Sequence, residues 1–374
     1  MPKIQIKKKD KAANKLSVAY FVGKVISRVN AKVGAKVACR LSEETTISQV
    51  RTWIPTGIRW LDSVTGGGVP AGRLTEVFGW EGVGKTALCE RVVKHCQDMG
   101  GIVNIIEPES SLERKRMLKD NVNLEEVIYS APNAVEEIFQ EIDETIAAIT
   151  EEAPEQLILI VWDSVAGTSS IQELEAEYGE KQYAPAAFVI SQAMRKIAGQ
   201  IAKTNVALLF INQLRENVGA SKFEDPYRTY GGHAIGFKAA LRINLQRHGI
   251  VRLSSTDKKI DGISVKADII KNKTFGNAPL QFAKFPIMFY EGGISDIRSL
   301  FDWWETLGYV TPIGSMYKAE GVDTRFYRKN WPEFYQENKE AIEVAVAAKV
   351  AEQKPQTLLE EKPTAPETTE ENDA

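Results

Sequence analysis

Residues 79–86, with the sequence Gly-Trp-Glu-Gly-Val-Gly-Lys-Thr, constrain the fold of this chain more than any other segment. They match the G-x-x-x-x-G-K-[ST] pattern of a phosphate-binding loop. An apolar run at 74–78 predicts a strand before the loop, and a helical pattern at 87–93 follows it. A glycine-rich turn can carry such residues by chance. The strand–loop–helix context instead favours a nucleoside triphosphate site, because backbone N–H groups and a helix N-terminus bind phosphate there.

The residue types of the loop also suggest what each would do. Lys85 would reach the β- and γ-phosphates, and the hydroxyl of Thr86 would bind Mg²⁺. The residues that we expect around the triphosphate are Gly79, Glu81, Gly82, Val83, Gly84, Lys85, Thr86 and Ala87.

Length and composition indicate a globular protein. The chain has 374 residues, of which 43% are hydrophobic, and no run approaches the ~20 apolar residues of a membrane span. Its three cysteines have neither metal-ligand nor disulfide spacing, and no signal peptide is recognisable. We therefore expect a cytoplasmic protein.

Charge is distributed unevenly between the two ends. Residues 1–40 hold nine Lys and two Arg against the single acid Asp10, and residues 360–374 hold six acids against Lys362. These ends are either solvated termini or functional elements. In the second case a basic element contacts a partner, and an acidic tail competes with nucleic acid for a basic surface.

Apolar patterning divides the chain into four parts. Residues 1–50 contain a basic amphipathic helix at 16–33 that needs a partner surface. Residues 51–293 alternate strands and helices, which predicts an α/β fold with a mostly parallel twisted sheet flanked by helices. Residues 294–352 predict a small α-rich lobe, and the acidic segment 353–374 has the composition of a disordered tail. The strand candidates are 74–78, 102–106, 156–162, 205–211, 239–245 and 263–270.

Polar residues follow three of these strands, where ligands bind in an open parallel sheet. Asp163 follows one strand and suits Mg²⁺, because a hard cation that bridges phosphates needs oxygen ligands. Glu109 is the candidate general base for the water that attacks the γ-phosphate. The amide of Gln213 does not titrate, so it cannot be the general base. We expect it instead to sense whether the γ-phosphate is present.

The stretch 215–232 is long, charged and glycine-rich, and it lies between two predicted strands. It carries Arg215, Lys222 and Arg228 together with aromatic residues such as Phe223. Cations that contact phosphates and rings that stack on bases are typical of single-strand binding. The composition alone leaves a mobile lid as an equal alternative.

The chain resembles the RecA family of bacterial and phage recombinases over about residues 54–293, and more loosely to residue 350. The hexad Ser-Gln-Ala-Met-Arg-Lys at 191–196 and the Asn-Gln-Leu-Arg segment at 212–215 are the most specific signals. The other segments that carry the resemblance are 66–73, the phosphate-binding loop, 163–166, 230–232 and 271–273.

The resemblance implies a RecA-type P-loop ATPase that uses ATP and Mg²⁺. Glu109 matches the family's catalytic glutamate and Gln213 its γ-phosphate sensor. Lys271 and Lys273 match a pair that reaches the neighbouring subunit's ATP. Residues 1–35 match an arm that packs on the adjacent protomer. The implied DNA-binding residues lie in or beside two loops, 175–183 and 215–229, and are Arg195, Arg215, Lys222, Phe223, Arg228, Gly231 and Gly232.

The sequence departs from the family pattern near the nucleotide base and in the lobe. Arg116 stands where the family stacks an aromatic ring on adenine, and Glu113 falls near the adenine-contacting acid. His233 replaces an amide beside the paired glycines. The lobe after Gly293 is short and diverged, which puts the family's duplex-DNA capture in question.

The expected function is an ATP-dependent recombinase. It would form a helical filament on single-stranded DNA, pair that strand with homologous duplex DNA, and release it after hydrolysis. Candidate further partners are a single-strand-binding protein and a repressor. A ring-forming helicase or branch-migration ATPase has the same core fold, because head-to-tail contacts that close make rings. An ATP-switched regulatory protein that does not bind DNA is a third possibility; the two loops and the lysine pair favour the first.

Overall fold

The computed structural model describes residues 18–35, 37–40, 42, 50–109, 112–177, 185–217, 227–253, 259–274, 281–290 and 292–353. These residues fall into two compact units. Unit 1 lies within Met1–Gly57, Leu61–Gln246 and Ala267–Phe282, and unit 2 lies within Ile58–Trp60, Arg247–Lys266 and Ala283–Ala374. The predicted boundaries at residues 50, 293 and 352 stay predictions.

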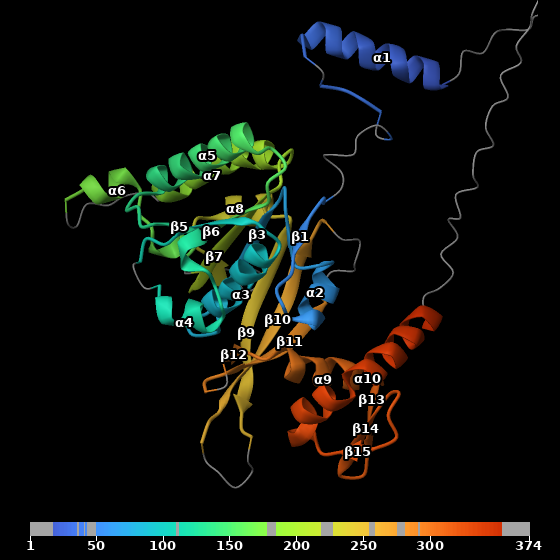
Figure 1. The fold of residues 1–374 in the computed structure, drawn as a ribbon. Helices are drawn as coiled ribbons and strands as arrows, with labels where there is room; N and C mark the ends of the chain where they lie inside the picture. The colour runs from blue at the N-terminus through green and yellow to red at the C-terminus, as the bar shows by residue number, and fades with distance from the viewer. Residues whose placement is uncertain are drawn as a thin grey trace, which may run out of the picture. The chain divides into compact units, whose positions relative to one another are not determined.

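A mostly parallel sheet forms the centre of unit 1 (Figure 1). Its strand order is β10-β9-β3-β7-β6-β4-β5, and β8 pairs with β7 off this path. The pairs β3–β7, β3–β9, β6–β7, β4–β6 and β4–β5 are parallel. The strands are β3 (Leu74–Gly79), β4 (Ile102–Ile106), β5 (Val127–Ser130), β6 (Ile158–Trp162), β7 (Val206–Glu216), β8 (Tyr227–Thr229), β9 (Leu241–Val251) and β10 (Gly262–Asn272).

This sheet confirms the α/β fold and all six predicted strands. Two strands extend well beyond their predicted ends: β7 continues to Glu216 and β9 to Val251. β5 was not predicted. Its pattern is only partly buried, so it lacks the continuous apolar run that marked the other strands.

Helices α5 and α7 cover one face of the sheet and lie side by side (Figure 1). Their apolar residues, such as Ile142 and Ile190, join a core cluster with Phe210 of β7. Trp162 at the end of β6 is fully buried and packs edge-to-face on Phe139 and Phe210, at centroid distances of 5.5 and 5.0 Å. The helices that belong wholly to unit 1 are α1 (Val18–Val33), α3 (Lys85–Asp98), α4 (Arg114–Lys119), α5 (Val135–Glu152), α6 (Ile171–Glu175), α7 (Pro185–Ile201) and α8 (His233–Lys238).

The predicted N-terminal amphipathic helix is present as α1, and none of its residues is buried. Apolar side chains such as Val18 and Phe21 are more than half exposed. None of the helices in the described ranges is long and apolar enough to cross a membrane.

Unit 2 has its own aromatic core, which includes Phe301, Phe326 and Trp331. Arg59 donates to Asp296 at 2.8 Å and to Glu343 at 2.9 Å, which ties three segments of this unit together. The segment predicted as an α-rich lobe contains two helices and also a three-stranded sheet that was not predicted. The further elements of unit 2 are β11 (Phe282–Met288), whose first residue belongs to unit 1, β12 (Gly293–Ile294), α9 (Asp296–Thr306), β13 (Val310–Ile313), β14 (Met316–Ala319), β15 (Arg325–Phe326), η3 (Arg328–Asn330) and α10 (Trp331–Gln353).

Five short elements remain. Four of them lie in unit 1, and α2 spans its boundary with unit 2. They are β1 (Trp53–Ile54), α2 (Arg59–Thr65), β2 (Val69–Pro70), η1 (Leu124–Glu126) and η2 (Val165–Gly167).

Candidate nucleotide and DNA site

The predicted phosphate-binding loop connects β3 directly to α3. Strand β3 ends at Gly79, and α3 begins at Lys85. Gly82 and Gly84 have φ values of 71° and 90°, in the left-handed region that favours glycine. The strand–loop–helix arrangement places the first backbone N–H groups of α3 at the loop, where an anion binds.

Lys85 folds back over this loop. Its Nζ donates to the carbonyl oxygens of Gly79 at 3.1 Å and Trp80 at 2.9 Å. Burial lowers the pKa of Lys85, while Asp163, Glu81 and other nearby acids oppose that shift. The ammonium therefore lies beside the loop, within reach of a phosphate bound there.

Thr86 and Asp163 form the predicted Mg²⁺ pair. Thr86 Oγ1 donates to Asp163 Oδ2 at 2.9 Å. Burial raises the pKa of Asp163 to about 6; the Thr86 hydrogen bond and Lys85 oppose the rise, and Glu109 and Glu107 add to it. In the described part of the chain, no group of three or more His, Cys, Asp or Glu could hold a metal ion. One hydroxyl and one carboxylate fit an ion that takes its other ligands from phosphate and water.

Glu109 lies on the segment after β4, as predicted. Ser164 Oγ donates to Glu109 Oε1 at 2.5 Å, and this bond joins the segments that follow β4 and β6. Glu109 is exposed, so water reaches its carboxylate. Glu107 is buried and accepts a hydrogen bond from Tyr129 at 3.2 Å.

Strand β7 places Gln213 directly opposite Gly79 of the loop. The preceding residue, Asn212, is fully buried and holds the strand end. Its Nδ2 donates to Glu76 Oε1 and to the Tyr230 carbonyl, both at 3.0 Å, and its Oδ1 accepts the Gln213 N–H at 2.9 Å. The sensing role of Gln213 stays a prediction, but its backbone lies beside the loop.

The two described ends of the long stretch 215–232 form a ribbon of paired strands. Arg215 of β7 pairs with Arg228 of β8, so two exposed arginines lie opposite each other. The Arg215 guanidinium lies 4.8 Å from the centre of the Tyr230 ring. Gly231 and Gly232 have φ values of 80° and 72° and turn the chain into α8. Two other predicted DNA contacts, Lys222 and Phe223, lie outside the described residues.

Arg195 lies on α7, away from this ribbon in sequence. Its side chain is exposed, and Nη1 donates to Ser191 Oγ at 3.5 Å. The described part of the first predicted loop, 175–177, begins at the last residue of α6. The DNA contacts assigned to both loops stay predictions.

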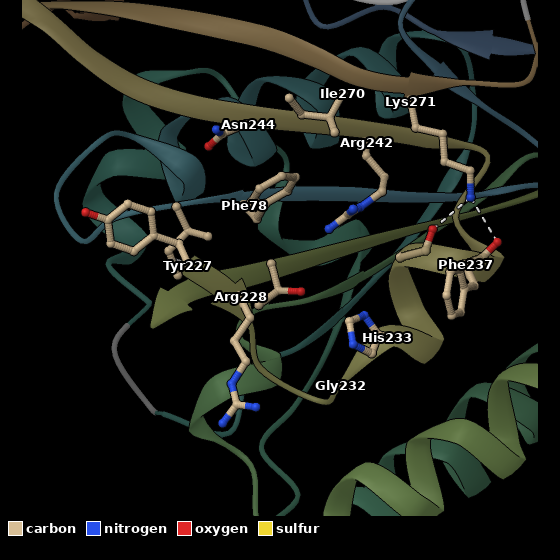
Figure 2. A pocket seen from close by; sticks show the side chains of 13 residues that line it. Phe78, Tyr227, Arg228, Gly232, His233, Phe237, Arg242, Asn244, Ile270 and Lys271 are labelled. Carbon is tan, nitrogen blue, oxygen red and sulfur yellow. Dashed lines mark hydrogen bonds between the residues drawn. The ribbon is translucent and has the colours of Figure 1, made fainter. Parts of the chain in front are cut away.

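A cavity of about 570 Å³ lies beside the ribbon (Figure 2). Arg228, Gly232 and Lys271 line it, so it brings together predicted DNA contacts and a lysine predicted to act across subunits. Phe78, Asn244 and Ile270, which the sequence pattern did not single out, also line it, as does Tyr227, one of the aromatic residues of the stretch 215–232. Phe78 and Ile270 lie near the ends of β3 and β10, which is a weak signal, and Asn244 lies within β9.

Lys271 is held at the C-terminal end of α8. Its Nζ donates to the carbonyl oxygens of Gly236 at 2.8 Å and Phe237 at 2.9 Å (Figure 2). Burial lowers the pKa of Lys271 to about 8; Lys273 and Arg242 add to the shift and Glu76 opposes it. Lys273 is anchored through its backbone N–H, which donates to the Ala240 carbonyl at 2.8 Å.

Arg116 pairs with a buried acid. Its Nε lies 2.8 and 2.7 Å from the two carboxylate oxygens of Glu90, whose side chain is 3% exposed. Burial raises the pKa of Glu90, and the Arg116 hydrogen bond opposes the rise. Glu113 is exposed and precedes α4 as its N-cap residue. Sequence reasoning missed Glu90. The contact of Arg116 and Glu113 with a nucleotide base stays a prediction.

Glu76 of β3 and Arg242 of β9 form an ion pair, with Arg242 Nε 2.6 Å from Glu76 Oε2. The Glu76 side chain is fully buried. We expect Arg242→Met to lower the free energy of unfolding by about 3–5 kcal/mol at pH 7, because the buried carboxylate loses its cation. Chemical denaturation measures this. The double variant Glu76→Gln/Arg242→Met should lose clearly less unfolding free energy than Arg242→Met does. Equal losses in both variants would show that the packing of Arg242, and not its charge, matters.

Comparison with known proteins extends over most of the chain. The family model described as RecA N-terminal domain matches residues 21–295. A Protein RecA of Aquifex aeolicus is 38% identical over 296 residues, which cover 79% of this chain and 82% of that protein. The Protein RecA of Aquifex pyrophilus is 37% identical over 293 residues, or 78% and 80% of the two chains. A Synechococcus Protein RecA is 32% identical over 331 residues, or 88% and 83%.

Proposed function

This chain belongs to the RecA family and is an ATP-dependent recombinase of DNA recombination and repair, and we propose how its described residues share that work. Its enzymatic activity is DNA-dependent ATP hydrolysis. The observation that carries the proposal is the course of β7. This strand passes the phosphate-binding loop at Gln213 and continues into the ribbon that carries Arg215. One rigid strand thus connects the two sites.

The loop and its neighbours bind and hydrolyse ATP. Lys85 contacts the β- and γ-phosphates, and Thr86 and Asp163 hold Mg²⁺, whose charge offsets that of the phosphates. Glu109 accepts a proton from the attacking water, and Ser164 orients its carboxylate through the 2.5 Å hydrogen bond. Gln213 contacts the γ-phosphate and changes position when it leaves. Glu113 and Arg116 lie nearest the base.

The ribbon and the segments beside it bind single-stranded DNA. Arg215 and Arg228 face each other across the ribbon and supply cations to the phosphate backbone. Arg195 extends this basic surface, as do Lys222 and Phe223. The backbone at Gly231 and Gly232 lies close to the strand, because glycine leaves room for it.

Assembly into a helical filament completes the site. Lys271 and Lys273 contact the ATP of the adjacent protomer, and the exposed helix α1 packs on that neighbour. The filament pairs its strand with homologous duplex DNA. A single-strand-binding protein and a repressor are further proposed partners, and the cytoplasm is the proposed location.

The lysine pair gives a direct test of catalysis in trans. We expect Lys271→Ala/Lys273→Ala to lower DNA-stimulated ATP turnover by about 10²-fold or more, because cations supplied across an interface stabilise the transition-state charge. A steady-state phosphate-release assay with and without single-stranded DNA measures this. The matched control is Lys94→Ala, which changes a partly buried lysine paired with Asp98 on α3. Normal stimulated turnover in the double variant would contradict catalysis in trans.

Electron microscopy tests the function as a whole. We expect long single-stranded DNA and a slowly hydrolysed ATP analogue to produce extended helical filaments, and omission of the analogue to remove them. Discrete rings would instead indicate a helicase-type motor. In that case Lys271 and Lys273 would be ring-interface residues.

A further inference from the structure

An aromatic contact joins the phosphate-binding loop to the DNA-binding ribbon. Trp80 lies inside the loop, and Tyr227 is the first residue of β8. Their ring centroids are 5.2 Å apart at an interplanar angle of 84°, an edge-to-face pair. Each residue is 44% exposed, so both rings lie at the protein surface.

The backbone of Trp80 is bonded by the lysine that would bind phosphate. Lys85 Nζ donates to the Trp80 carbonyl at 2.9 Å. The phosphates of ATP compete for the same ammonium protons, because the lysine of such a loop reaches the β- and γ-phosphates. Binding of ATP therefore weakens one of the bonds that position Trp80.

Tyr227 belongs to the ribbon itself. It pairs with Glu216 of β7 and is adjacent to Arg228, the partner of Arg215. Tyr227 and Arg228 also line the same cavity beside β7 (Figure 2). A change in the position of Tyr227 consequently moves a short strand that carries a DNA-contacting cation.

We propose that the contact between Trp80 and Tyr227 couples ATP occupancy of the loop to the arrangement of the β7–β8 ribbon, and so to DNA affinity. The two residues are positioning residues that act through Lys85 and Arg228. The inference rests on the proposed function and adds a second connection to it. Gln213 would connect the nucleotide to the ribbon through β7, whereas the contact between Trp80 and Tyr227 connects the phosphate-binding loop to β8.

Binding of a fluorescent single-stranded oligonucleotide, with and without a slowly hydrolysed ATP analogue, tests the coupling. We expect Tyr227→Leu to reduce the analogue-dependent gain in affinity about three- to tenfold, the size of a ring–ring contact. The affinity measured without nucleotide should stay the same. Tyr227→Phe keeps the ring and should keep the gain. The matched control is Tyr327→Leu, which changes a tyrosine of unit 2 that is 47% exposed.

A double-mutant cycle separates coupling from two independent effects. If the two rings act through each other, the double variant Trp80→Leu/Tyr227→Leu should reduce the analogue-dependent gain in affinity no more than the single variant with the larger effect does. Additive losses would overturn the inference. An unchanged analogue-dependent gain in Tyr227→Leu would also overturn it. So would a loss of DNA affinity that is equal with and without the analogue, because Tyr227 would then be a direct DNA contact. If the unaltered protein shows no analogue-dependent gain, the proposed function itself fails.

Discussion

Lys85→Ala is expected to lower kcat/KM for ATP hydrolysis by at least about 10²–10³-fold, the cost of removing one donor that stabilises transition-state charge. The structure supports a large effect because Nζ lies beside the loop, where it donates to the Gly79 and Trp80 carbonyls. Steady-state hydrolysis and binding of a fluorescent ATP analogue measure the loss. Both should decrease, since the same ammonium serves binding and catalysis.

Lys94→Ala controls for the removal of a lysine from the same helix. Lys94 pairs with Asp98 four residues later on α3, and its side chain is 25% exposed. Such a pair contributes roughly 0.3–0.5 kcal/mol to stability, and it is outside the loop. We expect near-normal hydrolysis in this variant. Hydrolysis retained in Lys85→Ala would contradict the assignment of the whole loop.

Glu109→Gln should separate hydrolysis from DNA binding. Glutamine has nearly the same shape, so it can still accept the Ser164 hydrogen bond, but it cannot accept a proton from water. We expect kcat to decrease about 10²–10⁴-fold, the contribution of a general base. ATP-dependent binding of single-stranded DNA should remain, because nothing in the substitution removes a phosphate or DNA contact.

Single-turnover hydrolysis and oligonucleotide binding, measured on one preparation, decide the role of Glu109. Glu155→Gln is the matched control, since the Glu155 side chain is 81% exposed and forms an ion pair with Arg51. If Glu109→Gln loses ATP-dependent DNA binding as well, the bond between Ser164 and Glu109 has a structural role. If turnover is normal, another group is the base.

The candidate site was predictable where its residues follow a strand. The strands β3, β4, β6 and β7 are buried apolar runs, and the ends of parallel neighbours meet at one edge of the sheet. Lys85, Glu109, Asp163 and Gln213 could therefore be placed together before any contact was known. The hydrogen bonds of Thr86 with Asp163 and of Ser164 with Glu109 agree with that placement.

Partners distant in sequence were not predictable. Arg116 stood out only as an unusual residue near the base, and its ion pair with Glu90 depends on how α4 packs beside α3. Glu76 and Arg242 are 166 positions apart, and each looks like an isolated charge within a strand. β5 was missed because its residues are only partly buried.

The amino-acid sequence by itself determined the phosphate-binding loop, the α/β fold and the family of this chain, because each depends on local order: glycines at fixed spacing, apolar runs, and polar residues at strand ends. Only the tertiary structure decided which side chains meet. It placed Lys271 at the end of α8, Arg215 opposite Arg228, and Trp80 against Tyr227. Such contacts follow from strand pairing and register, which bring residues together without leaving a local pattern in the chain.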